Sequence, residues 1–449
     1  MKHLKHIIYF IFISSLFNDF PLHSQNWNKV GNGLNLQGWV MIEDTSSDRL
    51  LVAGDFSFLG GACSCNNFAW WNGASWSFFS DSTGPRPRAI TKYQGDIYCG
   101  TFNFYPASVQ PPQLCKLGNN KWLRTSKVHG NIYDLNIING KLYAAGTFDS
   151  IGGIKANDVA YYDGVWHAID TTSWEFPEMD RVIGYNNEIY VIGNFRSHDH
   201  TIRRMAKWNG VKWSNVGGNV FGYAMGVPRT MSVYKNKLYV GGTFSKSFGN
   251  PGNSLARWNG TSWDSIPGIY HPLGYGTVFD MKIYHDKLIL GGEFKYADTV
   301  ASTDMVAWDD TKFLSFGVHK FDLPVLNIGF YRDRIYVLCG DSIDNMLVNG
   351  IAYYDGTFAA VENIQASSIN INIYPNPFSN QILISSNGNY KNVKIQIHNV
   401  LGQLVYCSDA NLEEEIKIST EKFCPGFYHL SITQNNENIF LKKLIKVSD

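Results

Sequence analysis

The sequence has few charged residues, few cysteines and only one long apolar run. Asp, Glu, Lys and Arg make up 17% of its 449 residues, against about 25% in a typical soluble domain. The 38 basic residues balance 38 acidic ones, and this neutrality argues against electrostatic binding of nucleic acid. Because the apolar run lies at the extreme N-terminus, a polytopic membrane protein is also excluded. Seven cysteines in so long a chain do not make a disulfide scaffold.

Aromatic residues and glycine are abundant instead. Phe, Trp and Tyr make up 15% of the residues, and the chain contains 42 glycines. A chain that is this aromatic and this weakly charged can bury enough surface to fold, so disorder is excluded. Aromatic side chains favour strands and glycine favours tight turns, which indicates an all-β protein.

The N-terminus is typical of a secretory signal peptide. Lys2 and Lys5 precede an apolar run over residues 7–16, and we expect cleavage after Ser24. The run is too short to span a membrane, and polar residues follow it. We therefore expect residues 1–24 to be removed and the remaining chain to pass through the periplasm, with no membrane segment left.

Export permits disulfides. Cys99 and Cys115 fall in neighbouring predicted strands and could pair, as could Cys407 and Cys424 in the C-terminal region. Buried free thiols are the alternative.

One motif recurs seven times and decides the fold. Each copy is Leu or Ile, usually followed by Tyr, and then a glycine, with its second position at residues 51, 98, 143, 190, 239, 289 and 336. A second landmark, Ala-x-Trp-Asn-Gly-x-x-Trp, follows and is clearest at 206–213 and 256–263. A third, usually Tyr, ends an apolar strand five residues before each motif Tyr. Each repeat thus contains four short strands, which is the signature of a propeller blade.

These repeats predict a seven-bladed β-propeller over residues 25–364. We expect the repeated Trp and Tyr rings to form the core between blades rather than a ligand site. The segment 27–31 matches 213–217, Trp-Asn-Lys-Val-Gly against Trp-Ser-Asn-Val-Gly. We therefore expect the N-terminal segment to supply or double the outer strand of the last blade and close the ring.

The repeat resembles that of kelch-type propellers, which are related to the central domain of galactose oxidase. Kelch repeats place a Gly-Gly doublet after one strand, then a Tyr and a Trp at similar spacing. Only 241–242 and 291–292 keep the full doublet here, and Trp-Asn-Gly stands where Tyr-Asp is more usual. The resemblance implies a fold and says little about function. The copper ligands of galactose oxidase have no counterpart that we can place, so we expect no cofactor.

The pattern changes near residue 365. Short alternating strands predict a small Ig-like β-sandwich over residues 365–449. This segment resembles the type IX secretion system (type A) C-terminal sorting domain of Bacteroidota. The matching positions are Tyr374, Pro375, Asn376 and Pro377, Gly402 within 400–405, Gly426 and Tyr428 within 425–432, and Lys442 and Lys443 near the end. The resemblance implies export by the type IX machinery, its expected partner, followed by release or attachment to surface lipopolysaccharide. An ordinary Ig-like binding module is the alternative.

Irregular loops between the predicted blades supply the candidate binding residues. Three arginines stand near the starts of inner strands, where they would face or rim a central channel. Together with loop aromatics they would suit an anionic or sugar-like ligand. The alternative is that they pair with Glu178, Asp180 or backbone carbonyls and only seal the hub. The candidates are Arg88, Arg181, Arg229, Trp174, Tyr223, Tyr270, His271 and Tyr275.

No catalytic motif stands out. His198 and His200 lack a third ligand, so they are a weak zinc signal and we assign no metal site. The sequence therefore favours a secreted or surface-attached, non-enzymatic propeller that binds a glycan or a protein. One alternative is a propeller enzyme acting on extracellular polysaccharide, with acids drawn from Glu178, Asp180 or Asp280. A purely structural surface protein is the other.

Overall fold

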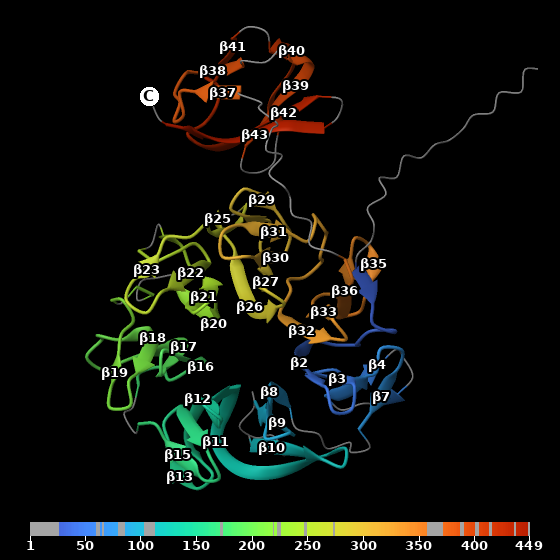
Figure 1. The fold of residues 1–449 in the computed structure, drawn as a ribbon, viewed down its shortest axis with the longest axis vertical. Helices are drawn as coiled ribbons and strands as arrows, with labels where there is room; N and C mark the ends of the chain where they lie inside the picture. Colours follow the sequence, from blue (N-terminus) through green and yellow to red (C-terminus); the bar gives the residue numbers. More distant parts are fainter. Residues whose placement is uncertain are drawn as a thin grey trace, which may run out of the picture.

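The fold is all-β, as the sequence predicts (Figure 1). The computed structural model describes residues 27–59, 63–64, 67–79, 86–102, 113–170, 174–218, 220–221, 226–246, 249–272, 274–356, 371–386, 390–399, 404–412, 415–434 and 437–447. The expected signal peptide and the linker after residue 356 lie outside these ranges. Within the described ranges we find no helix long and apolar enough to cross a membrane.

Four-stranded antiparallel units repeat along residues 27–356. The first unit contains β2 (Gly38–Asp44), β3 (Arg49–Gly54), β6 (Phe68–Trp71) and β7 (Trp76–Phe78). The second and third units merge into one eight-stranded sheet, because the long β11 pairs with β10 through its first half and with β12 through its second. This sheet contains β8 (Pro87–Tyr93), β9 (Asp96–Thr101), β10 (Gln113–Gly118), β11 (Lys121–Ile138), β12 (Lys141–Ile151), β13 (Ile154–Lys155), β14 (Val159–Tyr162) and β15 (Trp166–Ala168).

Four further units follow the same strand order. They are β16 (Met179–Tyr185), β17 (Glu188–Arg196), β18 (Arg203–Trp208) and β19 (Trp213–Ser214); β20 (Val227–Tyr234), β21 (Lys237–Thr243), β22 (Leu255–Trp258) and β23 (Trp263–Asp264); β26 (Thr277–Tyr284), β27 (Lys287–Glu293), β30 (Met305–Trp308) and β31 (Phe313–Ser315); and β32 (Asn327–Tyr331), β33 (Arg334–Leu338), β36 (Ile351–Tyr354) and β1 (Trp27–Lys29). Short strands decorate the connections: β4 (Phe58–Leu59), β5 (Cys63–Ser64), β24 (Ile269–His271), β25 (Gly274–Tyr275), β28 (Tyr296–Ala297), β29 (Val300–Ala301), β34 (Ser342–Ile343) and β35 (Met346–Leu347).

The first strands of the units stand around a common centre (Figure 1). They neighbour one another in the order β2, β8, β11, β16, β20, β26 and β32, and β32 in turn lies against β2. Each sheet stays open, and the sheets meet face to face through buried side chains. One such cluster joins Tyr185 and Tyr190 to Met231 and Leu238 of the next unit. Because each sheet buries its faces against its neighbours, most of the repeated rings are core, as expected.

The N-terminal strand completes the last unit. β1 pairs with β36, with Trp27 opposite Tyr354, and Trp27 is only 2% exposed. After β1, the carbonyl of Val30 accepts a hydrogen bond of 3.2 Å from the indole of Trp76. This contact repeats the one between Val216 and Trp263, also 3.2 Å. The expectation that this segment supplies the outer strand of the last unit is therefore confirmed.

The Trp-Asn-Gly landmark is a tight turn between the third and fourth strands. In the fifth unit the Asn259 side-chain oxygen accepts hydrogen bonds from the backbone N–H groups of Thr261 and Ser262. Gly260 has a φ of +104°, a conformation that favours glycine. The side chain of Asn209 accepts the same pair of bonds in the preceding unit. The repeated Asn thus stabilises the turn.

Five cysteines lie in the described part of the chain as free thiols. Cys99 and Cys115 are directly opposite each other on β9 and β10 and are buried. Burial raises the pKa of the Cys115 thiol to about 11. Cys407 and Cys424 are exposed.

Two further sheets form the C-terminal region. One contains β37 (Ile371–Tyr374), β38 (Gln381–Ser386) and β41 (Ile416–Ser419), and the other β40 (Leu404–Leu412), β39 (Tyr390–Asn399), β42 (Gly426–Gln434) and β43 (Glu437–Lys446). Isoleucines from both sheets share one buried cluster with Phe378 and Tyr428. The two sheets are therefore packed on each other, which agrees with the predicted sandwich.

Candidate functional site

Six of the seven first strands carry a β-bulge, which lies near the start of the strand in five of them and in the second half of the long β11. At each bulge the pairing with the second strand skips one residue, and a bulge re-aims the side chain of the residue it leaves unpaired. We call the skipped residues the belt: Trp39, Arg88, Tyr133, Asp180, Arg229 and Phe279.

A glycine of the repeated motif lies opposite five of these bulges, and Thr101 lies opposite the one at Arg88. In the third unit Gly146 faces the bulge, and a Cβ added to it would lie 1.9 Å from the carbonyl oxygen of Asn131. In the fourth unit a Cβ on Gly193 would lie 1.9 Å from the carbonyl oxygen of Glu178. Only glycine permits this close approach of the two strands. In these two units the glycine of the repeated motif therefore leaves room for the bulge that positions a belt residue.

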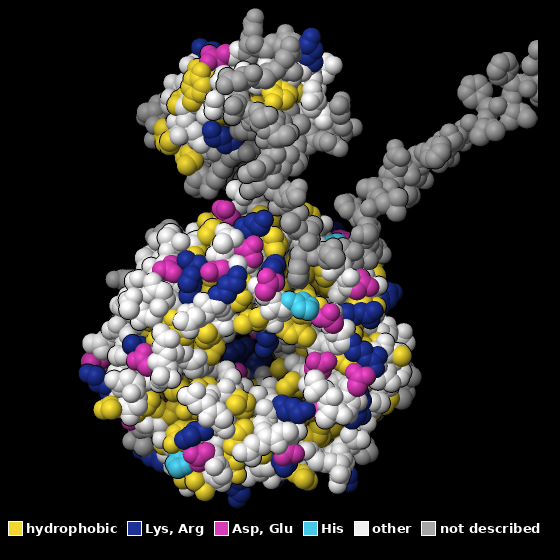
Figure 2. Space-filling model, in the orientation of Figure 1, with side chains coloured by type: hydrophobic (Ala, Val, Ile, Leu, Met, Phe, Trp, Pro, Cys, Tyr) yellow, Lys and Arg dark blue, Asp and Glu magenta, His cyan; other side chains and the backbone are white. Residues whose placement is uncertain are grey.

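The belt residues lie on the first strands, which stand around the centre of the ring, so we infer that they line the hollow there. All six of their side chains keep contact with solvent, and Arg88 and Arg229 are exposed. Figure 2 shows the hollow, with Lys or Arg side chains inside it. The Arg88 guanidinium lies 5.0 Å from the ring centroid of Trp39, and that of Arg229 lies 5.7 Å from Phe279. Two cation–π pairs thus bridge neighbouring units, one between β2 and β8 and the other between β20 and β26.

The charges of the belt act on one another across the hollow. Burial raises the pKa of Asp180 to about 6, while Arg181, Arg229 and Arg88 draw it down. Burial also lowers the pKa of Arg88, and the charge of Arg181 adds to that effect. Arg88 touches solvent and is nevertheless surrounded by protein, as expected for a side chain on the wall of a hollow. The three arginines predicted from the sequence are therefore brought together around one carboxylate.

The predicted arginines differ in their partners. Arg181 donates a hydrogen bond of 2.8 Å from Nη1 to the carbonyl of Asp180, which is one of the sealing contacts considered above. Among the described residues, neither Arg88 nor Arg229 has a carboxylate within 4.0 Å to form an ion pair. These two guanidinium groups thus offer hydrogen-bond donors to a ligand in the hollow.

Three of the loop residues predicted as ligand contacts, Trp174, Tyr270 and His271, lie outside the first strands that carry the belt. Trp174 is 7% exposed and packs edge-on against Phe195 and Trp213. Tyr270 accepts a hydrogen bond of 3.0 Å from the Asn253 amide, and its backbone pairs with that of Tyr275. His271 is partly buried on the same short strand as Tyr270. The structure gives no side-chain description of Tyr275, and Tyr223 lies outside the described residues.

The three candidate acids have different surroundings. Asp280 is 4% exposed, and its Oδ2 accepts hydrogen bonds of 2.9 Å from the Asn327 amide and from the backbone N–H of Ile328. These bonds tie β26 to β32, so Asp280 holds two units together. Glu178 and Asp180 are partly exposed near the start of β16, which leaves them as the acids at the hollow.

The paired histidines surround a glutamate. His198 Nδ1 lies 3.5 Å and His200 Nε2 3.6 Å from the carboxylate of Glu175, which also pairs with Arg196. The described residues contain no group of three or more His, Cys, Asp or Glu arranged to hold a metal.

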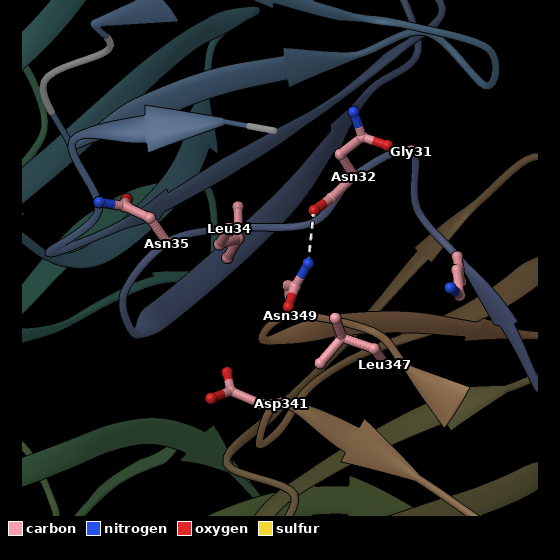
Figure 3. Close-up of a pocket in the computed structure, with 8 residues that line it drawn as sticks. Gly31, Asn32, Leu34, Asn35, Asp341, Leu347 and Asn349 are labelled. Carbon is pink, nitrogen blue, oxygen red and sulfur yellow. Dashed lines mark hydrogen bonds between the residues drawn. The ribbon is translucent and has the colours of Figure 1, made fainter. Parts of the chain in front are cut away.

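A second hollow of about 520 Å³ lies where the segment after β1 meets the last unit (Figure 3). Asn32, Leu34, Asp341 and Leu347 line it, and the Asn349 amide donates a hydrogen bond of 2.9 Å to the carbonyl of Asn32 across it. This bond joins the N-terminal segment to the last unit. The second hollow therefore belongs to the contact by which the N-terminal segment completes that unit.

Three of the positions predicted to carry the sorting signal make hydrogen bonds within the C-terminal region. The side-chain oxygen of Asn376 accepts a hydrogen bond of 2.8 Å from the backbone N–H of Ile445. Lys442 donates one of 3.0 Å to the carbonyl of Ile373, and the Tyr428 hydroxyl donates one of 2.7 Å to Cys424. The motif after β37 is thus fastened to the last strand. Gly402 and the side chain of Lys443 are not described.

Comparison with known families decides what this region is. Residues 372–447 match the model described as the secretion system C-terminal sorting domain. The chain carries a type IX sorting domain. This domain indicates export by the type IX system to the cell surface or the medium, and it implies contact with that machinery.

Other similarities are partial. An ulvan lyase of Nonlabens ulvanivorans is 36% identical over 92 residues, which are 20% of this chain and 16% of the lyase. PorZ, a surface component of the type IX secretion system of Porphyromonas gingivalis, is 14% identical with a TM-score of 0.45, over 93% of this chain and 59% of that one. An α-L-arabinofuranosidase of Clostridium thermocellum is 10% identical with a TM-score of 0.24, over 64% and 96%. The chain thus spans less than two thirds of the lyase and of PorZ, and the structural scores are too low to support a functional argument.

Proposed function

We propose that this chain is a type IX-exported, seven-bladed β-propeller that binds an acidic glycan at the belt without transforming it. The ring of seven first strands, in which β32 returns to β2, supports the propeller. The mixed cores between successive units support radial packing of blades. The kelch-type repeat remains a prediction from the sequence.

The observation that carries the binding function is a pair of arginines, Arg88 and Arg229, that have no carboxylate partner among the described residues and that belong to the belt around the central hollow. Arg88 and Arg229 each lie over an aromatic ring, which fixes the guanidinium plane. A guanidinium held in this way can donate two hydrogen bonds to a carboxylate or a sulfate. The accessible faces of Trp39 and Phe279 add apolar contact area beside these donors. An acidic sugar offers both an anionic group and a carbon-rich face.

Binding to a glycan array tests this function. The mature protein and the double variant Arg88→Gln/Arg229→Gln would be applied to acidic and neutral glycans. We expect the native protein to bind acidic glycans and the double variant to lose most of that signal. Arg124→Gln is the matched control, because Arg124 is an exposed arginine on the outer half of β11. Equal signals from the native protein and the double variant would refute the proposal.

One observation favours an enzyme as the second candidate. Asp180, with a pKa raised to about 6, can hold and release a proton near neutral pH. The partial similarity to an ulvan lyase makes ulvan the first polysaccharide to test. If the native protein cleaves ulvan or another acidic polysaccharide and Asp180→Asn does not, catalysis replaces simple binding as the function of the belt.

A further inference from the structure

We propose that the belt recognises two acidic groups of one ligand, one at each arginine–aromatic pair, and that Asp180 takes up a proton as the second group binds. This inference rests on the binding function proposed above and names the class of ligand as an oligosaccharide with at least two acidic groups.

The two arginine–aromatic pairs occupy separate arcs of the ring. Trp39 and Arg88 belong to the adjacent strands β2 and β8, and Arg229 and Phe279 to the adjacent strands β20 and β26. β11 and β16 separate the pairs on one side, and β32 separates them on the other. A single carboxylate accepts the forked hydrogen bonds of one guanidinium. Full use of both arginines therefore needs two acidic groups on one ligand.

Asp180 is placed between the two pairs. It lies on β16, which neighbours β20 on one side and β11 on the other. Its carboxylate interacts electrostatically with both Arg88 and Arg229, although these belong to different pairs. Without a ligand, Asp180 is therefore the negative charge that both pairs share.

The surroundings of Asp180 set the direction of its response. The charged or titratable groups that face it are Arg88 from β8, Tyr133 from β11, Arg229 from β20, and Glu178 and Arg181 from its own segment. A ligand anion at each arginine neutralises the positive charges that keep Asp180 ionised, and adds negative charge beside it. Both effects raise the pKa of a carboxyl group.

Proton uptake makes binding depend on pH in a defined direction. The pKa of Asp180 is about 6 in the free protein and is higher in the complex, so the complex holds one more proton than the free protein within this window. The dissociation constant then rises with pH by up to about tenfold per pH unit, the limit for one linked proton. At more acidic pH, Asp180 is already protonated and the dependence disappears.

Calorimetric titration of the mature protein with mono-, di- and trigalacturonate tests the inference, because these probes differ in their number of carboxylates. We expect digalacturonate or trigalacturonate to bind at least about tenfold more tightly than the monomer, as for a second engaged charge pair. Arg88→Gln and Arg229→Gln should each reduce the longer probe to the affinity of the monomer, and Arg124→Gln should not.

The proton is measured by repeating the titration at neutral pH in buffers of different ionisation enthalpy. We expect proton uptake, of up to one proton per bound ligand, by the native protein and none by Asp180→Asn or Asp180→Ser, both checked for native melting temperature. Equal affinity for all three probes, or no proton uptake by the native protein, would overturn this inference. If the arginine variants still lose binding in that case, the proposed binding function survives. If none of the three probes binds at millimolar concentration, the inference is wrong, and the array then decides the binding function separately.

Discussion

The phenol of Tyr331 donates a hydrogen bond to the backbone carbonyl of Asp48, 2.8 Å away and 283 residues earlier in the chain. The same contact joins successive units elsewhere in the ring. Tyr185 donates to the carbonyl of Asn236 at 3.2 Å, and Tyr284 to that of Asp333 at 2.7 Å. In each case the tyrosine ends a first strand and the acceptor lies in the first hairpin turn of the next unit. The last unit therefore contacts the first through the bond that its predecessors use.

Replacement of Tyr331 tests whether this bond stabilises the ring. Tyr331→Phe keeps the aromatic side chain but leaves the Asp48 carbonyl without this donor. We expect a loss of about 1 kcal/mol in the free energy of unfolding. Urea unfolding measures the loss. Tyr185→Phe removes the equivalent bond inside the ring and should cost a similar amount. A loss in Tyr185→Phe with no change in Tyr331→Phe would show that the seam between the last and first units is open in solution.

The outer strand of the last unit, β1, should contribute more to the stability of the protein than the Tyr331 hydrogen bond does. Trp27 is buried against Phe321 and Tyr354 at ring-centroid distances of 5.4 and 5.1 Å. We expect Trp27→Ala to destabilise the protein by about 3–5 kcal/mol, as for other buried tryptophans, and deletion of residues 25–31 to lower the melting temperature sharply. Lys29→Ala is the control, since Lys29 lies on the same strand and is exposed. An unchanged melting temperature after the deletion would rule out a role for β1 in closing the ring.

Some belt residues could be predicted from the sequence and others could not. Arg88 and Arg229 stood out because each lies five residues before a landmark Tyr. Phe279 stands at the same spacing from Tyr284, yet an aromatic residue in an aromatic repeat gave no signal. Trp39 has Asp44 where the landmark Tyr would be, so its equivalence appears only from the pairing register.

The fold was more accessible to prediction than the site. Hydrophobic alternation, the Asn-Gly turns and the even spacing of the repeat all describe local structure, which each unit repeats. The sequence around Trp174 does not show that this side chain is buried, because its burial depends on Phe195 and Trp213 from other strands. The structural role of Asp280 was equally hidden, since its partners Asn327 and Ile328 belong to the next unit.

Asp280 gives a prediction that separates structure from catalysis. Asp280→Ala leaves the Ile328 N–H and the Asn327 amide without their buried acceptor, and we expect a loss of about 2–3 kcal/mol in stability. Asp286→Ala, at an exposed position in the neighbouring turn, should change stability little. Denaturant unfolding compares the two. Native stability in Asp280→Ala would mean that the bonds between β26 and β32 contribute little and that another role must explain this acid.

Two buried carboxyl groups make stability depend on pH. Burial raises the pKa of Asp158 to about 7 and that of Asp304 to about 6. The folded protein therefore holds protons that the unfolded chain, with a pKa near 3.8 for each group, has released. The stability that each group contributes is therefore full below its unfolded pKa of 3.8 and is lost as the pH rises from there through the folded pKa of about 7 or 6, by up to about 1.4 kcal/mol per pH unit for each group.

Urea unfolding at pH 5 and pH 8 measures this dependence. In these experiments the native protein should be less stable at the higher pH, and Asp158→Asn/Asp304→Asn should reduce the difference. A difference of the same size in the double variant would show that other groups, such as Asp180, carry it.

The sorting domain predicts a change at both ends of the chain during export. The contacts of Asn376 with Ile445 and of Lys442 with Ile373 fasten its motif to the last strand, so the domain should fold as a unit that the machinery can recognise. We expect deletion of residues 365–449 to leave the protein in the periplasm. Cell fractionation with mass spectrometry of the mature ends checks this, and it should show that surface or medium fractions of the native protein have lost residues 1–24 and the C-terminal domain.

Replacing Asn376 by Ala removes only the acceptor for Ile445 and should slow export without changing the fold of the propeller. If the deleted protein reached the surface as efficiently as the native one, the export signal would have to lie elsewhere in the chain.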